Sequence, residues 1–251
     1  MSNVSVGTYW MSWASAPLTS IEKHVDYVML AFLDPSGTTG LPDASEIARD
    51  IRELRKKNAN MKILVSVGGG SAGDWAQSVN VAQIVQFVSE CHADGVDIDY
   101  EPPNAWDANC SQVTANYLQI VNAFRQALPS PNLLTSAVWD NGVSTTNAIP
   151  VLQSGLLDHI FIMTYDSGMQ TYPYESIVHQ FVQFVPPHKI FLGIESPVEG
   201  VPGHVCSISE AHQVRKIAER KQLGGVFMWA WEKNDSQPTA TQLYHALVHE
   251  A

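Results

Sequence analysis

One stretch of the chain decides its fold: Asp94-Gly95-Val96-Asp97-Ile98-Asp99-Tyr100-Glu101. In a β-strand, side chains alternate between two faces, and residues two apart lie roughly 6.6 Å from each other on the same face. The acidic residues Asp97, Asp99 and Glu101 therefore form a column, and the apolar and aromatic residues between them face the other way. Because that second face is apolar, a solvated edge strand is a poor interpretation. We expect the column to point into the interior of a closed sheet.

Carboxylates stacked in an apolar interior cannot all be ionised at low cost, because burial and like charge both favour the protonated form. At least one of them is expected to hold a proton or to share it with its neighbour. Glu101, at the end of the strand and so at the mouth of the sheet, is expected to be a protonated acid near neutral pH. A divalent-metal site and a purely structural role are the alternatives. Acid catalysis is the favoured interpretation, without a metal or cofactor.

Eight apolar, β-branched or aromatic runs alternate with helical patterns along the 251 residues. As strands, these runs are Val4–Trp10, Tyr27–Leu33, Lys62–Val67, Gly95–Glu101, Leu133–Trp139, His159–Tyr165, Lys189–Ile194 and Gly225–Trp231. Continuous apolar strands indicate a sheet that is covered on both faces. Eight β/α units in a chain of this length are typical of a closed parallel barrel, with a doubly wound open sheet as the alternative. The predicted fold is an α/β (β/α)8 TIM barrel, with residues 1–251 as a single catalytic domain.

Six segments between the strands have the 3.6-residue periodicity of amphipathic helices. They are Ala44–Lys57, Val81–His92, Val113–Leu128, Glu175–Val185, Glu210–Gln222 and Ala240–His249, and the helical patterns after the first and fifth strands are weak. Asp43 is the predicted N-cap of the first helix, with Glu46 as its capping-box partner. A barrel carries its chemistry on the loops at the C-terminal ends of its strands, so the site is expected there.

The balance of charge excludes some classes of partner. The chain has 14 Lys and Arg residues against 25 Asp and Glu residues, a formal charge of −11. Without a positive surface for phosphate, nucleic acid and anionic membranes are not expected partners. A neutral or cationic ligand suits this surface better. No stretch approaches the roughly 18 apolar residues needed to cross a bilayer.

The N-terminus and the cysteines say less about function. The first six residues lead into a strand-like segment without the pattern of a signal peptide, so a cytoplasmic protein and a secreted one whose leader has been removed are both consistent with them. The cysteines, Cys91, Cys110 and Cys206, are odd in number and lack the spacing of a zinc site. They are expected to be structural thiols with at most one disulfide. The nine histidines show no paired spacing that suggests a metal.

All the tryptophans fall at or just beyond predicted C-terminal strand ends. They are Trp10, Trp139, Trp229 and Trp231 on the strands and Trp13, Trp75 and Trp106 in the loops that follow. Rigid aromatic rings gathered at one rim offer stacking surfaces for the flat faces of sugar rings. The alternative is that these rings are buried in the core. For Trp229, burial in the core and a place on the floor of a pocket are equally favoured. For the three loop tryptophans a ligand role is favoured.

Four motifs in strand order together resemble family 18 of the glycoside hydrolases, the chitinases and endo-β-N-acetylglucosaminidases. Residues 94–101 resemble the family's DxxDxDxE motif, and Ser66-Val67-Gly68-Gly69 resembles its SxGG motif. Met163-Thr164-Tyr165-Asp166 is similar to the MxYD motif, and Met228-Trp229 to the terminal tryptophan motif. They fall on the third, fourth, sixth and eighth predicted strands, so the resemblance covers essentially the whole chain.

The resemblance implies a role for each motif residue. Glu101 would protonate the glycosidic oxygen, Asp99 would orient the acetamido group of the substrate, and Asp97 would share a proton with Asp99 from below. Tyr165 would hydrogen-bond the acetamido oxygen, and Trp229 would form the floor under the reacting sugar. Ser66 is expected to hydrogen-bond the acidic column. The full set of expected substrate-binding residues is Trp229, Tyr9, Asp166, Met163, Trp139, Trp75 and Trp13.

The expected function is endo-acting hydrolysis of β-1,4 linkages in chitin or chito-oligosaccharides. The acidic residues share one strand and no motif places a carboxylate opposite them, which is consistent with the substrate's own acetamido group acting as nucleophile, as in this family. The segment between the seventh and eighth strands is too short for an additional α+β domain, so an open cleft is expected. The alternatives are an endo-β-N-acetylglucosaminidase that acts on N-glycan cores and a non-catalytic chitin-binding lectin.

Overall fold

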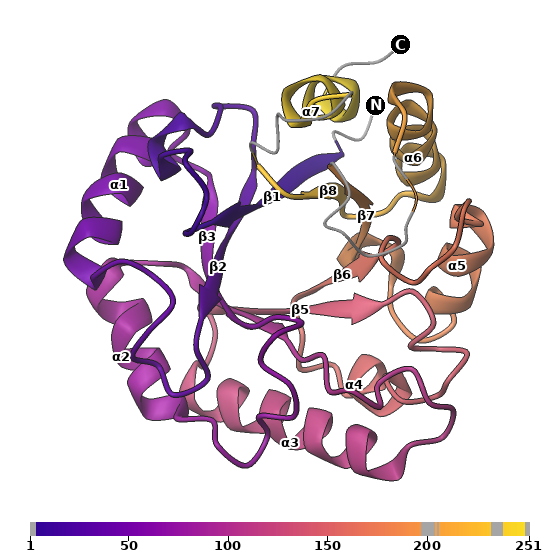
Figure 1. Ribbon diagram of the computed structural model, residues 1–251, viewed down its shortest axis with the longest axis horizontal. Coiled ribbons are helices and arrows are strands. Elements are labelled where there is room, and N and C mark those ends of the chain that lie inside the picture. Colours follow the sequence, from indigo (N-terminus) through magenta and orange to yellow (C-terminus); the bar gives the residue numbers. More distant parts are fainter. Residues whose placement is uncertain (1–3, 197–203, 205, 232–237, 249–251) are drawn as a thin grey trace.

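Eight parallel strands close into a barrel in chain order in the computed structural model, which describes residues 4–196, 204, 206–231 and 238–248 (Figure 1). The strands are β1 (Ser5–Met11), β2 (Tyr27–Leu33), β3 (Lys62–Gly68), β4 (Gly95–Asp99), β5 (Leu133–Trp139), β6 (His159–Met163), β7 (Ile190–Glu195) and β8 (Gly225–Trp229). Each strand pairs in parallel with its neighbours, and β8 pairs with β1. The prediction of a single (β/α)8 barrel is confirmed.

Helices surround the strands in the order of the chain (Figure 1). They are α1 (Ala44–Lys57), α2 (Val81–Cys91), α3 (Ser111–Ala127), α4 (Ile149–Gln153), α5 (Tyr174–Phe181), α6 (Ile208–Lys221) and α7 (Ala240–Val248), with two short 3-10 helices, η1 (Leu18–Ser20) and η2 (Pro187–Lys189). The two weak helical patterns correspond to η1 after β1 and to the five-residue α4 after β5. None of the helices within the described ranges has the length and apolar character needed to span a membrane.

The N-terminus of α1 differs from the prediction. Asp43 precedes the helix, but its side chain makes no capping hydrogen bond. The main-chain amides of Glu46 and Ile47 instead donate to the main-chain carbonyl of Asp43, at 2.9 and 3.1 Å, so the predicted capping box is wrong. A complete capping box is found at α6, where the Ser207 hydroxyl accepts from the Glu210 amide and the Glu210 carboxylate accepts from the Ser207 amide. All three cysteines are free.

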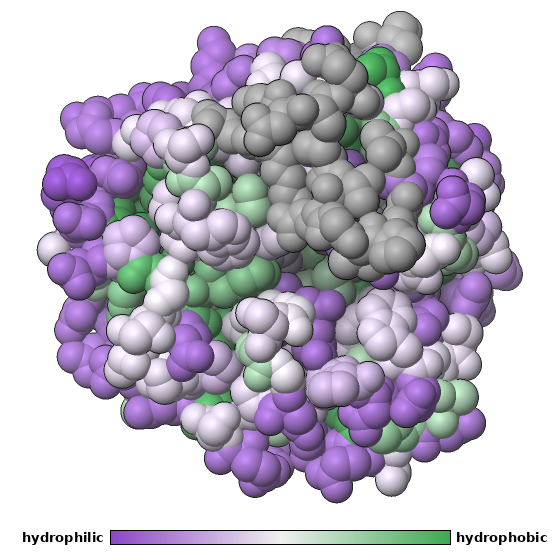
Figure 2. Space-filling view, in the orientation of Figure 1, coloured by the Kyte–Doolittle hydropathy of each residue, from purple (hydrophilic) through white to green (hydrophobic). Residues whose placement is uncertain are grey.

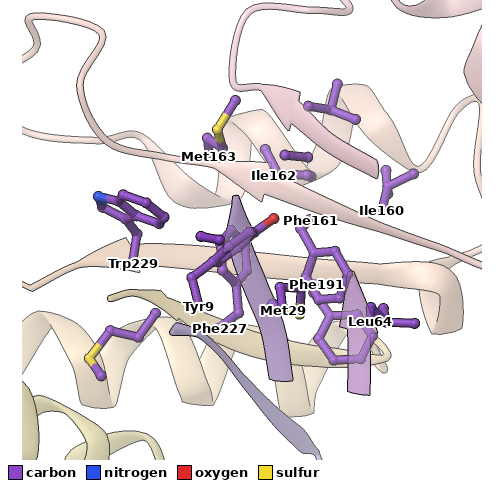
Figure 3. Packing of buried hydrophobic residues seen from close by; sticks show 14 of the residues in the cluster. Tyr9, Met29, Leu64, Ile160, Phe161, Ile162, Met163, Phe191, Phe227 and Trp229 are labelled. Atoms are coloured by element: carbon purple, nitrogen blue, oxygen red, sulfur yellow. The ribbon is translucent and has the colours of Figure 1, made fainter. Parts of the chain in front are cut away.

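Aromatic rings fill the interior of the barrel from its N-terminal floor to its mouth. Phe191, Phe161 and Phe227 follow one another at centroid distances of 4.8 and 5.3 Å, and Tyr9 lies 5.9 Å beyond Phe227. Trp229 packs edge-on against Tyr9 at 5.4 Å, and Figure 3 shows this pair with the phenylalanines beneath it. Such offset and edge-on contacts are the preferred arrangements of aromatic pairs. The packed interior leaves the mouth as the place where the barrel can receive a ligand.

The floor of the barrel holds a partly buried histidine, His159. The Tyr27 hydroxyl on β2 and Nε2 of His159 on β6 lie 3.0 Å apart, which links two non-neighbouring strands. Both rings pack edge-on against Phe191, at 5.1 and 5.2 Å. Burial lowers the pKa of His159 from 6.5 to about 4, with Lys189 and His188 adding to the effect and Asp158 opposing it.

This burial predicts a pH dependence of folding. Below pH 6.5 the unfolded chain takes up a proton at His159 that the folded protein refuses until about pH 4, so the stability falls as the pH falls through this window. The slope for one such group is about 1.4 kcal/mol per pH unit. In urea unfolding between pH 7 and pH 4, the wild type should lose stability relative to His159→Gln. The exposed His179→Gln is the control, and equal pH dependence of all three proteins would contradict the prediction.

Candidate functional site

A cavity of about 330 Å³ opens at the C-terminal ends of the strands. Its lining combines acidic residues with aromatic ones: Tyr9, Phe32, Gly70, Asp99, Glu101, Trp106, Met163, Tyr165, Asp166 and Trp229. The expected site is therefore largely assembled in one place, from β1, β2, β4, β6 and β8 and from loops that include the one after β3. In Figure 2, hydrophobic side chains gather in the inner left part of the view, and hydrophilic ones border the outline.

The deepest acid of the column, Asp97, is satisfied by hydroxyl groups. Its Oδ2 accepts hydrogen bonds from the Tyr9 hydroxyl at 2.9 Å and the Ser66 hydroxyl at 2.8 Å, and its Oδ1 accepts one from Thr135 at 2.6 Å. Ser66 and Thr135 are the register partners of Asp97 on β3 and β5. Burial raises the pKa of Asp97, and these three donors act against that effect. The expectation that Ser66 binds the acidic column is confirmed.

The middle acid, Asp99, is the member of the column whose surroundings most disfavour ionisation. Its pKa is raised well above the ordinary value, first by burial and then by the charges of Glu101 and Asp97. Among the described residues, no hydrogen bond is found between Asp99 and Asp97. The hydrogen bond that affects the pKa of Asp99 is the one with Glu101. That bond raises the pKa of Asp99 and lowers that of Glu101. The sharing of a proton between Asp97 and Asp99 that the resemblance implied stays a prediction.

The outermost acid, Glu101, titrates near neutrality. Burial raises its pKa from 4.5 to about 7, the charge of Asp166 raises it further, and the hydrogen bond with Asp99 acts in the opposite direction. A carboxylic acid with this pKa is protonated in a large fraction of molecules at pH 7 and can donate a proton to a bound group. The expectation of a protonated acid at the mouth therefore agrees with the electrostatics of the site.

Gly68 at the end of β3 and Gly70 in the loop after it make room for the acidic column. A Cβ on Gly68 would lie 2.2 Å from the main-chain oxygen of Asp99, and Gly68 has a φ of +108°, which favours glycine. A Cβ on Gly70 would lie 3.4 Å from Oε1 of Glu101. Gly69 donates its amide to the Asp99 carbonyl at 2.9 Å. The Gly-rich stretch is thus explained by close approach to β4.

A polar network anchors the segment that carries Glu101. Tyr100, between the two outer acids, donates its hydroxyl to Oδ1 of Asp74 at 2.7 Å. The Asn116 amide on α3 donates to both oxygens of Asp74, at 3.2 and 3.1 Å. Because successive residues point to opposite sides, fixing Tyr100 on the outside also fixes the acids on the inside.

The aromatic wall of the cavity extends beyond it. Phe32 stacks on Trp229 with a centroid distance of 5.5 Å and an interplanar angle of 19°. Trp13 also stacks on Phe32, with a centroid distance of 6.0 Å and an interplanar angle of 28°. The Trp13 side chain is 60% exposed. The predicted position of Trp13 at the rim is confirmed, and Trp229, 9% exposed, lines the pocket rather than being enclosed in the core.

Two further cavities continue the central one in both directions. One, of about 540 Å³, shares Phe32, Gly70 and Trp229 with it and is also lined by Trp13. The other, of about 500 Å³, shares Trp106 and Asp166 and is also lined by Asp140, Asn141, Ser167 and Met169. The three together form a groove across the mouth of the barrel. An extended ligand is the kind of molecule that such a groove fits.

Tyr165 and Met163, both expected in the site, line the central cavity. Burial raises the pKa of Tyr165 well above its ordinary value, and the charges of Asp99 and Glu101 add to this effect. The phenol therefore remains a hydrogen-bond donor throughout the neutral range. Tyr9 and Asp166 also lie where they were expected, and Asp166 has a φ of +56°, an uncommon backbone conformation for a residue other than glycine.

Two expected substrate-binding residues are placed elsewhere. Trp75 is 2% exposed and packs edge-on against Tyr100, and Trp139 is 1% exposed and packs against Tyr117 on α3. Neither lines any of the three cavities of the groove. A ring without accessible surface cannot stack on a sugar, so the prediction of direct substrate contact is wrong for both. Each supports the residues that carry the site.

Sequence reasoning missed other members of the site. Phe32 lies inside an apolar strand run, where only its place near the C-terminal end of β2 could have indicated a role. Glu195 ends β7 with 3% exposure and adds to the electrostatic field at Tyr165. Among the described residues, no group of three or more histidine, cysteine or carboxylate side chains is arranged to hold a metal ion.

The chain is similar in sequence to a known protein family and to several of its members. The model of the family described as glycosyl hydrolases family 18 matches residues 5–204. Chitinase C from Streptomyces lividans is 30% identical over 137 residues, which are 46% of this chain and 21% of that protein. This chain therefore spans about a fifth of the length of that curated relative.

Solved structures share the fold over almost the whole chain. A family 18 chitinase from Pseudoalteromonas aurantia superposes with a TM-score of 0.78 at 19% identity and covers 97% of this chain and 100% of its own. A family 18 chitinase from Cycas revoluta in complex with (GlcNAc)3 has a TM-score of 0.76 at 18% identity, with 97% and 98% covered. At these identities the likeness establishes the barrel architecture.

The electrostatics of the mouth predict how Glu101 responds to its neighbours. Replacing Asp166 with Asn removes a negative charge that raises the pKa of Glu101, so this pKa should fall from about 7 by about 0.5 to 1. The measurement is a carboxyl ¹³C NMR titration, with the Glu101 signal assigned by its loss in Glu101→Gln. Asp140→Asn is the control, because Asp140 does not contribute to the pKa of Glu101. An equal response to both substitutions would show that Asp166 has no specific effect.

Proposed function

This chain belongs to family 18 of the glycosyl hydrolases, and we propose that it hydrolyses β-1,4 linkages between N-acetylglucosamine units in chitin or chito-oligosaccharides. The observation that carries the proposal is the acidic column, which ends at Glu101 with a pKa of about 7 in a cavity lined by Trp229, Tyr9 and Tyr165. Relatives named as chitinases, one of them solved with (GlcNAc)3, support the choice of substrate.

Glu101 is the general acid in this proposal. A fraction of Glu101 is protonated at neutral pH, and its carboxyl faces the cavity, where it can protonate the oxygen of the scissile bond. The departure of the leaving sugar then leaves Glu101 ionised. The same carboxylate can act next as a base and take a proton from the water that completes hydrolysis.

Asp99 and Tyr165 act on the acetamido group of the reacting sugar. Both line the cavity, and the pKa of Asp99 and that of Tyr165 are raised well above their ordinary values, which favours the protonated form of each. The Tyr165 hydroxyl can donate to the acetamido oxygen. Asp99 can accept the acetamido N–H with its carbonyl oxygen or, once its proton has moved to Glu101, with its carboxylate. Asp97, held by three hydroxyls, stabilises the column from below.

The nucleophile in this proposal is the acetamido oxygen of the substrate. It attacks the anomeric carbon as the leaving group departs, and water then opens the cyclic intermediate from the vacated face. Asp166 is the carboxylate that could compete for this role, since it lines the cavity and lies close enough to Glu101 to raise its pKa. The need for an N-acetyl group on the substrate distinguishes the two routes.

The shape of the groove supports an endo mode of cleavage. Cavities continue from the central one past Trp229 toward Trp13 and past Trp106 toward Asp140, so sugar units fit on both sides of the cut. The exposed ring of Trp13 offers a stacking platform on the side of the reacting sugar. Cleavage within a long chain needs such binding on both sides.

The acid role of Glu101 is tested by Glu101→Gln. The amide keeps the shape of the side chain and removes the transferable proton, so kcat on chitotetraose should fall by about 10²- to 10⁴-fold. Binding of chitotetraose, measured by calorimetry, should stay within a few fold. Glu53→Gln, an exposed acid on α1, is the control and should keep full activity. A Glu101→Gln variant with more than about a tenth of the wild-type kcat would exclude Glu101 as the acid.

The substrate and the nucleophile are tested together by a panel of oligosaccharides. N-acetylglucosamine oligomers should be cut internally with the β-anomer as the first product in NMR, while fully deacetylated oligomers and cellulose oligomers should not be cut. Retention alone would also fit an attack by Asp166, so the need for the N-acetyl group is the deciding result. Cleavage of a high-mannose glycoprotein instead would indicate an endo-β-N-acetylglucosaminidase. Binding without cleavage of any substrate would indicate a lectin.

A further inference from the structure

The position of Trp106 is set by its main chain more than by packing of its ring. The indole is 40% exposed and lines both the central cavity and the neighbouring cavity that contains Asp140. Its aromatic contact is an edge-on one with Trp139 at 6.4 Å. Trp106 lies in the loop of residues 100–110 between β4 and α3, the same loop that carries Glu101. Any force that holds this loop therefore also places the ring in the groove.

One buried side chain holds the main chain on both sides of Trp106. Asn147, 0% exposed, donates from Nδ2 to the carbonyl of Ala105 at 2.9 Å and to the carbonyl of Asp107 at 2.7 Å. Its Oδ1 accepts the amide of Cys110 at 2.8 Å. Both donors and the acceptor of the amide are thus used on one loop. Aspartate lacks the donors, and leaving two main-chain carbonyls without them would be costly.

Main-chain hydrogen bonds hold the turn that carries Asn147. Asn147 follows β5 in a turn in which the Thr145 amide bonds the Asn141 carbonyl at 2.8 Å and the Ala148 amide bonds the Gly142 carbonyl at 3.1 Å. The turn leads into α4, the neighbour of α3 in the ring of helices (Figure 1). A second connection, from the Thr146 hydroxyl to Oδ1 of Asn109 at 3.0 Å, joins the same two loops without touching the carbonyls that flank Trp106.

We propose that Asn147 is a positioning residue that holds Trp106 against the sugar on the leaving-group side of the cut. This inference rests on the proposed function, in which the reacting sugar lies on Trp229 and the groove continues past Trp106 on the opposite side of the bond. Asn147 itself touches no substrate. It acts through Trp106, so its loss weakens binding of the leaving-group sugars and leaves the acid chemistry of Glu101 in place.

A double-mutant cycle tests this route of action. Asn147→Ala should raise KM for chitotetraose about tenfold and change kcat by less than threefold. In a Trp106→Ala background, the same substitution should change KM by less than twofold, because the ring through which it acts is gone. Thr146→Ala, which removes only the second connection between the loops, is the matched control and should leave KM within twofold. An equal rise of KM with and without Trp106 would overturn the proposal.

A measurement without hydrolysis separates this proposal from the proposed function. In protein labelled with 5-fluorotryptophan, the ¹⁹F signal of Trp106, assigned by its loss in Trp106→Phe, should shift or broaden in Asn147→Ala and not in Thr146→Ala. An unchanged signal would overturn the positioning role, whether or not the protein cuts chitin. A changed signal in a protein that cuts none of the oligomers would overturn the proposed function, and the assignment to the leaving-group side with it. If Asn147→Ala does not fold, Asn147→Asp takes its place, and failure of both to fold would assign Asn147 to folding instead.

Discussion

The buried carboxylate of Asp97 is the constraint on which the mouth of the barrel depends. A carboxylate that is 0% exposed is costly unless donors surround it, and here hydroxyls from β1, β3 and β5 supply them. Two of these donors stand in register beside Asp97, and the third, Tyr9, reaches it because the sheet closes. Closure of the barrel and satisfaction of this charge therefore require each other.

The same constraint determines the chemistry above it. Burial, the charge of Glu101 and then the charge of Asp97 beneath it raise the pKa of Asp99. The pKa of Glu101, about 7, results from burial and the charge of Asp166, which raise it, and from the hydrogen bond with Asp99, which lowers it. The aromatic rings of Tyr9, Trp229 and Phe32 contact one another beside the column and add apolar surface to the cavity. A single strand of alternating acids thus holds one carboxylate that hydroxyls satisfy and two carboxyls with raised pKa values.

The periodicity of the sequence was sufficient to predict features that depend on a single strand or helix. The strand and helix periodicities located the barrel elements, and the period of two placed Asp97, Asp99 and Glu101 on a common face. It was not enough for Trp75 and Trp139, which follow strand ends as the expected platforms do but are turned into the core against Tyr100 and Tyr117. It also missed Phe32, because an aromatic residue in an apolar strand looks the same whether it faces the core or a groove. The predicted capping box at Asp43 was wrong because the main-chain carbonyl of Asp43, and not its side chain, accepts the amide of Glu46.

The sequence by itself determined the fold class, the strand that carries the acids and the motif residues that meet in the cavity, because each of these follows from periodicity within a single element. Only the tertiary structure decided which tryptophans have free surface, which hydroxyls hold Asp97, and how Asn147 reaches the loop of Trp106 from another β/α unit. These outcomes depend on distances between side chains far apart in the chain. Closing and packing the barrel is what sets those distances.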